Sequence, residues 1–380
     1  MDGNSILQLA TPCLLLDLER LDRNVRRLNE TIGAKGVTYR PHLKTAKSVD
    51  VTRRVLPSLA HPVTVSTLKE AEVFAAAGLT DILYAVGIAP AKLGRVVELR
   101  RKGADLSVIL DSVEQGRTVA KASAVSKERI PALIEIDSDG HRGGVAPEDG
   151  ETLAAIAAVL AADAKLRGVL THAGSSYSSR NREEINAWAV RERDAVVSAA
   201  SRLRKAGYEV PVVSVGSTPT ALSDIDLPGV TEVRAGVSMF FDLVQAGVGV
   251  CTPDDIALSV LTTVIGHQKE RGLMIVDAGW MALSRDRGTA AQPIDQKYGL
   301  VCDIEGNVLE GLLVLDANQE HGIVGMCEGS AARLPELPVG TRLRILPNHA
   351  CATAAQHSAY HVVQGGDPSI RALWPRFGGW

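Results

Sequence analysis

Apolar and polar residues follow two different patterns along the chain, and the change comes near residue 250. From residue 37 to residue 240, short runs rich in β-branched residues alternate with stretches of helical length. Several runs are continuously apolar, as expected for parallel strands covered on both faces. The runs number eight: residues 37–44, 63–67, 81–86, 106–111, 132–137, 168–173, 212–218 and 233–238.

The stretches between these runs predict helical crossovers. The clearest helical patterns cover residues 68–77, 91–102, 152–162 and 183–206. Eight strands joined by helices have the count and order of a (β/α)8 TIM barrel, so we expect an α/β fold of this kind over residues 20–250. A doubly wound open sheet is the alternative.

Beyond residue 250 the pattern becomes that of an antiparallel β-domain. Alternating segments at residues 258–266, 273–277, 312–316, 342–346 and 360–364 are separated by Gly, Asn and Asp turns. Residues 12–17 form one more predicted strand ahead of the barrel, and we expect it to pair with this domain. The predicted β-domain therefore comprises residues 1–19 and 251–380.

Composition narrows the class of partner. Of the 380 residues 46% are apolar and 22% are charged, and the net charge of −3 gives no basic field for nucleic acid or an anionic membrane. No apolar run approaches the roughly 20 residues of a membrane span, and no signal segment opens the sequence. Five scattered cysteines argue against a disulfide framework. We therefore expect a cytoplasmic protein with neither nucleic acid nor a membrane as its partner.

Chemistry in a barrel of this kind lies at the carboxyl ends of the strands. The first run closes with Arg40-Pro41-His42-Leu43-Lys44, and Pro41 marks the strand end because it donates no ladder hydrogen bond. Lys44 is thereby placed at the mouth of the barrel. A partly desolvated lysine is the residue type that forms a Schiff base with a carbonyl cofactor.

Polar and small residues follow the later strands as well. Arg142 stands among glycines beyond the fifth run, where a bound planar group would be a suitable partner. His172 ends the sixth run, with a satisfied core histidine as the alternative reading. The seventh and eighth runs end in glycines and hydroxyl residues, which predicts a phosphate site unless these are plain turns; the residues are Gly216, Ser217, Thr218, Gly236 and Ser238.

A second candidate pair follows the predicted strand at residues 342–346. His349 and Cys351 stand two residues apart on what the sequence predicts to be an extended segment, so both side chains would face the same way and could share one metal ion. Two ligands leave coordination positions open for water or substrate, which a Lewis-acid role requires. The alternative is a half-buried histidine beside an inert cysteine.

Several longer motifs resemble those of one known family. They are Arg40-Pro41-His42-Leu43-Lys44-Thr45, Ser66-Thr67-Leu68-Lys69-Glu70-Ala71, Ser214-Val215-Gly216-Ser217-Thr218-Pro219, Asp277-Ala278-Gly279-Trp280, Gln319-Glu320-His321-Gly322 and Pro347-Asn348-His349-Ala350-Cys351. The chain resembles, over nearly its whole length, the fold-type III enzymes that use pyridoxal phosphate (PLP). The resemblance is to their metal-activated branch, which holds D-serine dehydratase, D-threo-3-hydroxyaspartate dehydratase and D-threonine aldolase.

This resemblance implies a role for each candidate. Lys44 would hold PLP and act as the base at Cα, Arg142 would face the pyridine nitrogen, and His172 and Tyr177 would lie beside the cofactor. The hydroxyl and glycine residues after strands seven and eight would surround its phosphate. His349 and Cys351 would hold a divalent metal, with zinc expected before manganese, magnesium or cobalt. Aldolase members carry an aspartate where Cys351 stands, so the thiolate favours a dehydratase. A homodimer is also implied.

The substrate is predicted from a second arginine-rich motif. Arg285 and Arg287 in residues 284–289 would suit a second substrate carboxylate, and this stretch is most similar to that of the hydroxyaspartate dehydratases. The alternative is that they make surface or subunit contacts. His42 and Gln319 are further substrate candidates. We thus expect dehydration of D-threo-3-hydroxyaspartate or D-serine to a 2-oxo acid and ammonia.

Other activities and classes of protein remain to be weighed against this one. A retro-aldol lyase of the D-threonine aldolase type is the nearest rival. An amino-acid racemase would have no use for the His349 and Cys351 pair, and a non-catalytic PLP carrier would leave residues 250–380 unexplained.

Overall fold

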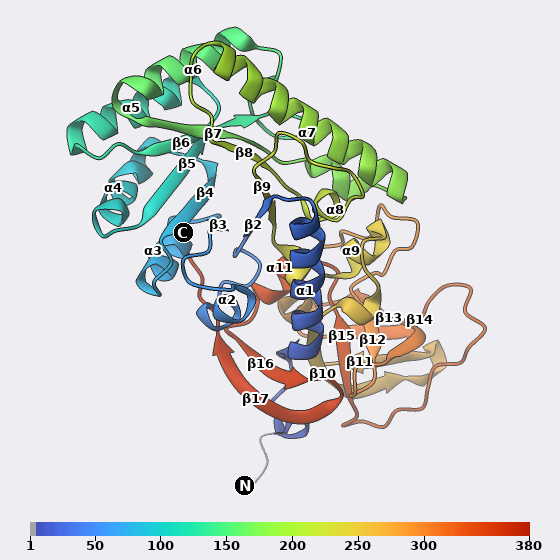
Figure 1. Ribbon diagram of the computed structural model, residues 1–380. Helices are drawn as coiled ribbons and strands as arrows, with labels where there is room; N and C mark the ends of the chain where they lie inside the picture. The colour runs from blue at the N-terminus through green and yellow to red at the C-terminus, as the bar shows by residue number, and fades with distance from the viewer. Residues whose placement is uncertain (1–4) are drawn as a thin grey trace. The chain divides into compact units, whose positions relative to one another are not determined.

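The computed structural model describes residues 5–380 and divides the chain into two compact units (Figure 1). The barrel unit comprises Arg27–Gly236 and Gly378–Trp380, and the β-unit comprises Met1–Arg26 and Val237–Phe377. Within the described range, none of the helices combines the length and the apolar character that crossing a bilayer requires.

The barrel unit contains the eight predicted parallel strands. They are β2 (Thr38–Pro41), β3 (Val63–Val65), β4 (Asp81–Gly87), β5 (Asp105–Leu110), β6 (Pro131–Ile136), β7 (Lys165–Thr171), β8 (Val212–Val215) and β9 (Glu232–Ala235). Their order is β2-β9-β8-β7-β6-β5-β4-β3, and a parallel bridge between His42 and Thr64 joins the two ends of the sheet. The barrel prediction is confirmed, and the doubly wound alternative is wrong.

Helices run along the outside of these strands (Figure 1). Several begin at a side-chain cap, as Thr67, Ser112 and Asn181 each accept a hydrogen bond from the backbone amide three residues later. The helices of the unit, with α1 beginning in the β-unit, are α1 (Leu18–Ala34), α2 (Val49–Val55), α3 (Leu68–Ala76), α4 (Leu93–Arg101), α5 (Val113–Ser126), α6 (Gly150–Asp163), α7 (Arg182–Lys205) and α8 (Thr218–Ala221).

Side chains fill the barrel interior. Leu83, Ile109, Leu133 and Leu170 form a buried cluster contributed by four successive strands. The buried Arg40 of β2 forms ion pairs with Glu232 (Nε–Oε2 2.8 Å) and Asp81 (Nη1–Oδ1 2.8 Å), which are the first residues of β9 and β4. The interior is therefore a packed core, which leaves the carboxyl ends of the strands for chemistry.

The β-unit is built on one nine-stranded sheet. Its strands are β1 (Cys13–Asp17), β10 (Leu258–Gln268), β11 (Leu273–Val276), β12 (Leu300–Cys302), β13 (Val308–Ala317), β14 (Gly322–Met326), β15 (Arg342–Leu346), β16 (Ala359–Gln364) and β17 (Asp367–Pro375). The order is β11-β14-β13-β12-β15-β10-β1-β16-β17, with a further pairing of β10 to β11. All pairs are antiparallel except β1 with β16. The predicted antiparallel β-domain is confirmed, and the early strand β1 belongs to it.

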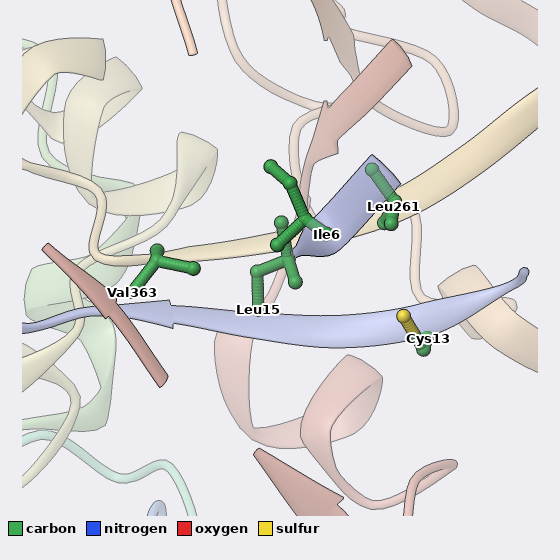
Figure 2. Close-up of a cluster of buried hydrophobic side chains, with 5 residues drawn as sticks. All are labelled: Ile6, Cys13, Leu15, Leu261 and Val363. Atoms are coloured by element: carbon green, nitrogen blue, oxygen red, sulfur yellow. The ribbon is translucent and has the colours of Figure 1, made fainter. Parts of the chain in front are cut away.

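A buried apolar cluster anchors β1 in that sheet (Figure 2). Leu15 on β1 packs with Leu261 on β10 and Val363 on β16, and Ile6 and Cys13 complete the group. Burial raises the pKa of the Cys13 thiol to about 12, so this cysteine acts as a small apolar side chain. Cys302 is also buried, and none of the five cysteines forms a disulfide within residues 5–380.

Candidate active site

The turn after β2 carries the candidate Schiff-base lysine. The His42 amide donates to the Ala235 carbonyl (2.8 Å) and the Leu43 amide donates to the Thr64 carbonyl (2.9 Å), so the turn is fixed to both neighbouring strands. Lys44 follows, and its amide donates to Nδ1 of His42 at 3.4 Å. Lys44 is exposed, rather than partly desolvated as the sequence predicted. A primary amine is thereby presented on a rigid backbone at the carboxyl end of the barrel.

His42 is part of this turn, and its imidazole is neutral. Its Nε2 is 3.4 Å from the Ser66 hydroxyl. Burial, and after it the positive charge of Lys44, holds the pKa of His42 well below the usual value of 6.5. His42 is therefore a fixed part of the turn next to the Lys44 amine.

His172, at the end of β7, is also held as a neutral imidazole. Its Nδ1 is 2.5 Å from the Gly216 carbonyl oxygen, which can only accept, so Nδ1 carries the proton and Nε2 has a free lone pair. Burial is the main reason that the pKa of His172 falls to about 3; nearby cationic side chains, with Arg142 and Lys44 among them, also lower the pKa. The Tyr177 ring lies 6.2 Å from the imidazole, tilted by 45°. The structure thus gathers Lys44, His172 and Tyr177 at one end of the barrel.

Arg142 lies on an exposed stretch of the loop after β6. Asp137 holds the backbone of this loop, because its Oδ1 accepts the amides of Asp139 (3.1 Å) and Gly140 (2.7 Å). The guanidinium is close enough to the buried carboxyl of Glu135 and to His172 to affect the pKa of each. Arg142 therefore faces the same end of the barrel as Lys44.

The loops after β8 and β9 approach their neighbours so closely that only glycine fits. A Cβ on Gly216 would lie 2.0 Å from the Arg234 carbonyl oxygen, and one on Gly236 would lie 2.7 Å from that of His42. The Ser217 hydroxyl is already engaged, because it caps α8 by accepting the Thr220 amide. By contrast, Oγ1 of Thr218 is buried and has no hydrogen-bond partner within residues 5–380. A buried hydroxyl without a partner is costly unless a ligand accepts from it.

Ser238 repeats this feature in the β-unit. Its side chain is fully buried, and its Oγ likewise has no hydrogen-bond partner within the described part of the chain. A buried hydroxyl of this kind can donate to an acceptor oxygen of a phosphate group.

The candidate metal pair lies in the β-unit, where the local structure differs from the prediction. His349 is extended, but Cys351 belongs to the short helix α11 (Ala350–Ala354). The prediction of one extended segment is wrong because the alanine-rich run favours a helix and Asp242 accepts the Ala350 amide at its start (2.9 Å). The two side chains are nevertheless neighbours: hydrogen bonds with Asp286 and Cys351 outweigh burial and raise the pKa of His349 to about 11.

Asp286 fixes the orientation of this imidazole. Its Oδ2 lies 2.6 Å from Nδ1 of His349, which leaves Nε2 for another partner. In the described residues there is no group of three or more His, Cys, Asp or Glu side chains placed to hold a metal ion, so the protein offers a pair of ligands. A thiolate and an imidazole are the donors that zinc prefers.

The substrate candidates differ in how they are held. The guanidinium of Arg285 is exposed and stacks over the Trp280 ring at 5.0 Å. Arg287 instead pairs with Asp295 (Nη2–Oδ2 2.7 Å). Gln319 exposes its side chain while its carbonyl accepts the Met281 amide (3.1 Å). Arg285 is therefore the better placed of the two arginines to receive an acidic ligand.

Comparison with known proteins places this geometry in a family. Residues 16–244 match the model of the alanine racemase N-terminal domain, and residues 257–363 match that of a putative serine dehydratase domain. The D-threo-3-hydroxyaspartate dehydratase of Delftia sp. strain HT23 is 52% identical over 99% of this chain and 100% of its own. The chain belongs to the fold-type III PLP family.

Two further comparisons, with a solved structure and with an aldolase, show how the similarity varies within the family. A solved structure of a cysteine-to-alanine mutant of D-threo-3-hydroxyaspartate dehydratase in the metal-free form has a TM-score of 0.96, 52% identity, and full coverage of both chains. The 3-hydroxy-D-aspartate aldolase of Paracoccus denitrificans strain Pd 1222 is 29% identical over 99% of this chain and 93% of its own. The chain is thus much more similar to the dehydratase than to this aldolase.

Three buried or half-buried residues of the site were missed by sequence reasoning. Arg234 on β9 donates from Nε to the Ser214 hydroxyl (2.9 Å) and from its other end to the Thr171 carbonyl. Glu192 on α7 accepts amides from two loops, and Asp286 orients His349. Only Asp286 had a signal in the sequence, since it stands in the motif with Arg285. Glu192 stands in the charged run at residues 191–194 and Arg234 follows Glu232 by two residues, so neither is distinguished from its charged neighbours.

Proposed function

We propose that this protein is a dehydratase, dependent on PLP and a divalent metal, that converts D-3-hydroxy amino acids to a 2-oxo acid and ammonia. Its preferred substrate is D-threo-3-hydroxyaspartate, which gives oxaloacetate. The observation that carries the proposal is the array at the end of the barrel, where the Lys44 amine is close enough to His42 and His172 to lower the pKa of each, and His172 bonds to the Gly216 carbonyl. The 52% identity to a dehydratase over 99% of the chain supports it.

PLP fits the barrel unit on chemical grounds. The Lys44 amine would hold the cofactor, Arg142 would face its ring nitrogen, and Tyr177 would lie beside it. Gly216, Thr218 and Gly236, with Ser217 through its backbone, would receive its phosphate, which gives the buried Thr218 hydroxyl an acceptor. The family resemblance implies the same role for Ser238. When bound, PLP withdraws electrons from the amino acid and so acidifies its Cα–H bond.

The residues of this chain would then remove the proton from the substrate Cα. The Lys44 amine, freed when the substrate takes its place, would remove the proton from Cα. His42 and His172 stay neutral beside it, because burial lowers the pKa of both. Two neutral imidazoles avoid adding positive charge next to an amine that must accept a proton.

His349 and Cys351 would hold the metal, and zinc is the metal we propose. A divalent ion at this pair supplies Lewis acidity for the β-hydroxyl, which is a poor leaving group in water. Asp286 would keep Nδ1 of His349 occupied so that Nε2 faces the metal, an arrangement common to metal-binding histidines.

Arg285 would recognise the β-carboxylate of hydroxyaspartate. It is exposed and stacked on Trp280, whereas Arg287 already pairs with Asp295. Arg285→Ala should therefore raise KM for D-threo-3-hydroxyaspartate by about tenfold to a hundredfold, as loss of a charged hydrogen bond implies, with little change for D-serine. Equal losses for both substrates would argue against this role.

Product analysis tests the proposed activity. The protein is incubated with D-threo-3-hydroxyaspartate, D-serine and D-threonine, and the products are identified. We expect oxaloacetate, pyruvate and 2-oxobutanoate, each with ammonia. Glycine plus an aldehyde would establish an aldolase instead, and an unchanged carbon skeleton with inverted Cα would establish a racemase.

We also propose that the enzyme is a cytoplasmic homodimer. In the described part of the chain the five cysteines form no disulfide, which fits a reducing compartment, and the dimer follows from the family resemblance. Light scattering of the purified protein tests the dimer, which a monomer mass would contradict.

A further inference from the structure

Glu192 stands in an unusual place on α7. The buried face of this helix repeats every three or four residues through Ile185, Ala189, Val196 and Ala199, and Glu192 occupies one position of the same face with 1% of its surface exposed. A carboxylate inside an apolar helix face is costly unless hydrogen bonds compensate. The compensation here comes from two loops of the active site.

One oxygen of Glu192 accepts two backbone amides. Oε1 receives the amide of Ala173 (3.0 Å) and the amide of Gly216 (2.8 Å). Ala173 follows His172 after β7, and Gly216 precedes Ser217 after β8. A hydrogen bond from Nδ1 of His172 to the Gly216 carbonyl (2.5 Å) links the same two loops. The carboxylate and the imidazole together therefore fasten the two loops to each other and to α7.

We propose that Glu192 is a positioning residue that holds the His172 loop and the Gly216–Thr218 loop in one fixed arrangement, ready for the cofactor. Through Gly216 it keeps the backbone beside the phosphate site in place. Through Ala173 and Gly216 together it keeps His172 in the tautomer with Nδ1 protonated. This inference rests on the proposed PLP site but concerns a residue that touches neither cofactor nor substrate.

The position of an oxygen atom, rather than the negative charge, carries this role. Glu192→Gln keeps the length of the side chain and an oxygen that can accept both amides. Glu192→Asp keeps the charge but withdraws the oxygen by one methylene. The side chain of Thr220 on α8 also bonds to Glu192, and a hydroxyl can serve either a carboxylate or an amide. The two variants therefore separate reach from charge.

The experiment measures PLP affinity by titration of the visible spectrum, with bound metal and melting temperature measured in parallel. We expect Glu192→Asp to weaken PLP binding by about tenfold or more, equivalent to 1.4 kcal/mol, and to alter the bound spectrum. Glu192→Gln should stay within about threefold of wild type, which corresponds to less than 1 kcal/mol. Metal content should not change in either variant. Val196→Ala, on the same buried face one turn later, is the control for general loss of packing.

Three outcomes would overturn the inference: wild-type PLP affinity in Glu192→Asp, an equal loss in Glu192→Gln, or the same loss in Val196→Ala. Hydrogen exchange of the cofactor-free protein gives a readout independent of PLP. Peptides containing Ala173 and Gly216 should exchange faster in Glu192→Asp than in wild type. Unchanged protection would refute the proposal that Glu192 holds the two loops in place. If the wild type bound no PLP, the proposed function would fail while the exchange result still judged Glu192.

Discussion

At the scale of single residues, two lysines close in sequence have different surroundings. Lys47 pairs with the buried carboxylate of Glu70 (Nζ–Oε1 3.3 Å), whereas Lys44 is exposed at the barrel end. Lys44→Ala should abolish covalently held PLP and lower kcat by roughly a thousandfold, the scale of a lost general base. Lys47→Ala should keep both. Visible spectra measure bound PLP and initial rates measure kcat. Loss of both in Lys47→Ala but not in Lys44→Ala would show that Lys47, not Lys44, holds the cofactor.

His172 makes the stability of the protein depend on pH. Its pKa is about 3 when folded and near 6.5 when unfolded, so between these values the unfolded chain binds a proton that the folded chain does not. The free energy of unfolding should therefore fall as pH drops below 6.5, by about 1.4 kcal/mol per unit.

The variant His172→Asn isolates this contribution. Urea unfolding of the cofactor-free protein at pH 7 and pH 5 should show wild type losing about 2 kcal/mol more than His172→Asn over this interval. His42 remains in both proteins and cancels from the difference. Identical pH dependence in the two proteins would show that His172 is not a buried neutral imidazole.

Among the site residues, sequence position alone predicts those that end strands. Lys44, His172 and the Gly216 loop each follow a buried run, so the barrel rule places them together. Glu192 and Arg234 act through contacts with residues distant in sequence, which no local pattern encodes. The sequence predicted the same role for Arg285 and Arg287. It gave no sign that Arg287 pairs with Asp295.

At the scale of elements, the loop after β8 depends on the absence of a side chain. Gly216→Ala would place Cβ 2.0 Å from the carbonyl oxygen of Arg234 on β9. The backbone of β8 or β9 would have to move to relieve this clash. We expect a loss of about 3 kcal/mol in unfolding free energy, at the upper end for overpacking, and weakened PLP binding. Gly94→Ala is the matched control, because a Cβ in that position on α4 meets nothing within 4 Å and should be neutral or stabilising. Equal effects would contradict this reading.

The strands show which elements a pattern can predict. All eight barrel strands were predicted because buried parallel strands are short β-branched runs. Three strands of the β-unit were missed for local reasons: β12 has three residues, β14 contains two glycines, and β17 contains Pro368 and Pro375. Strand β17 lies at the edge of the sheet, where proline is tolerated. The helix α11 was missed because strand-like residues precede its alanines.

At the scale of the whole molecule, two units carry different halves of the proposed chemistry. The barrel unit holds Lys44 and most of the proposed phosphate site, and the β-unit holds His349, Cys351 and Asp286. The two functions are separable by experiment, since loss of the metal should spare PLP. If one reaction uses both the PLP site and the metal site, loss of either should abolish activity.

Removal of the metal tests this central claim most directly. Oxaloacetate formation from D-threo-3-hydroxyaspartate is measured before chelation, after chelation and after zinc is restored, while the PLP absorbance is recorded. The account predicts a fall of about a hundredfold or more, equivalent to the several kcal/mol that a Lewis acid supplies, with full recovery and constant PLP occupancy. Activity that survives chelation, or PLP lost in step with activity, would contradict it.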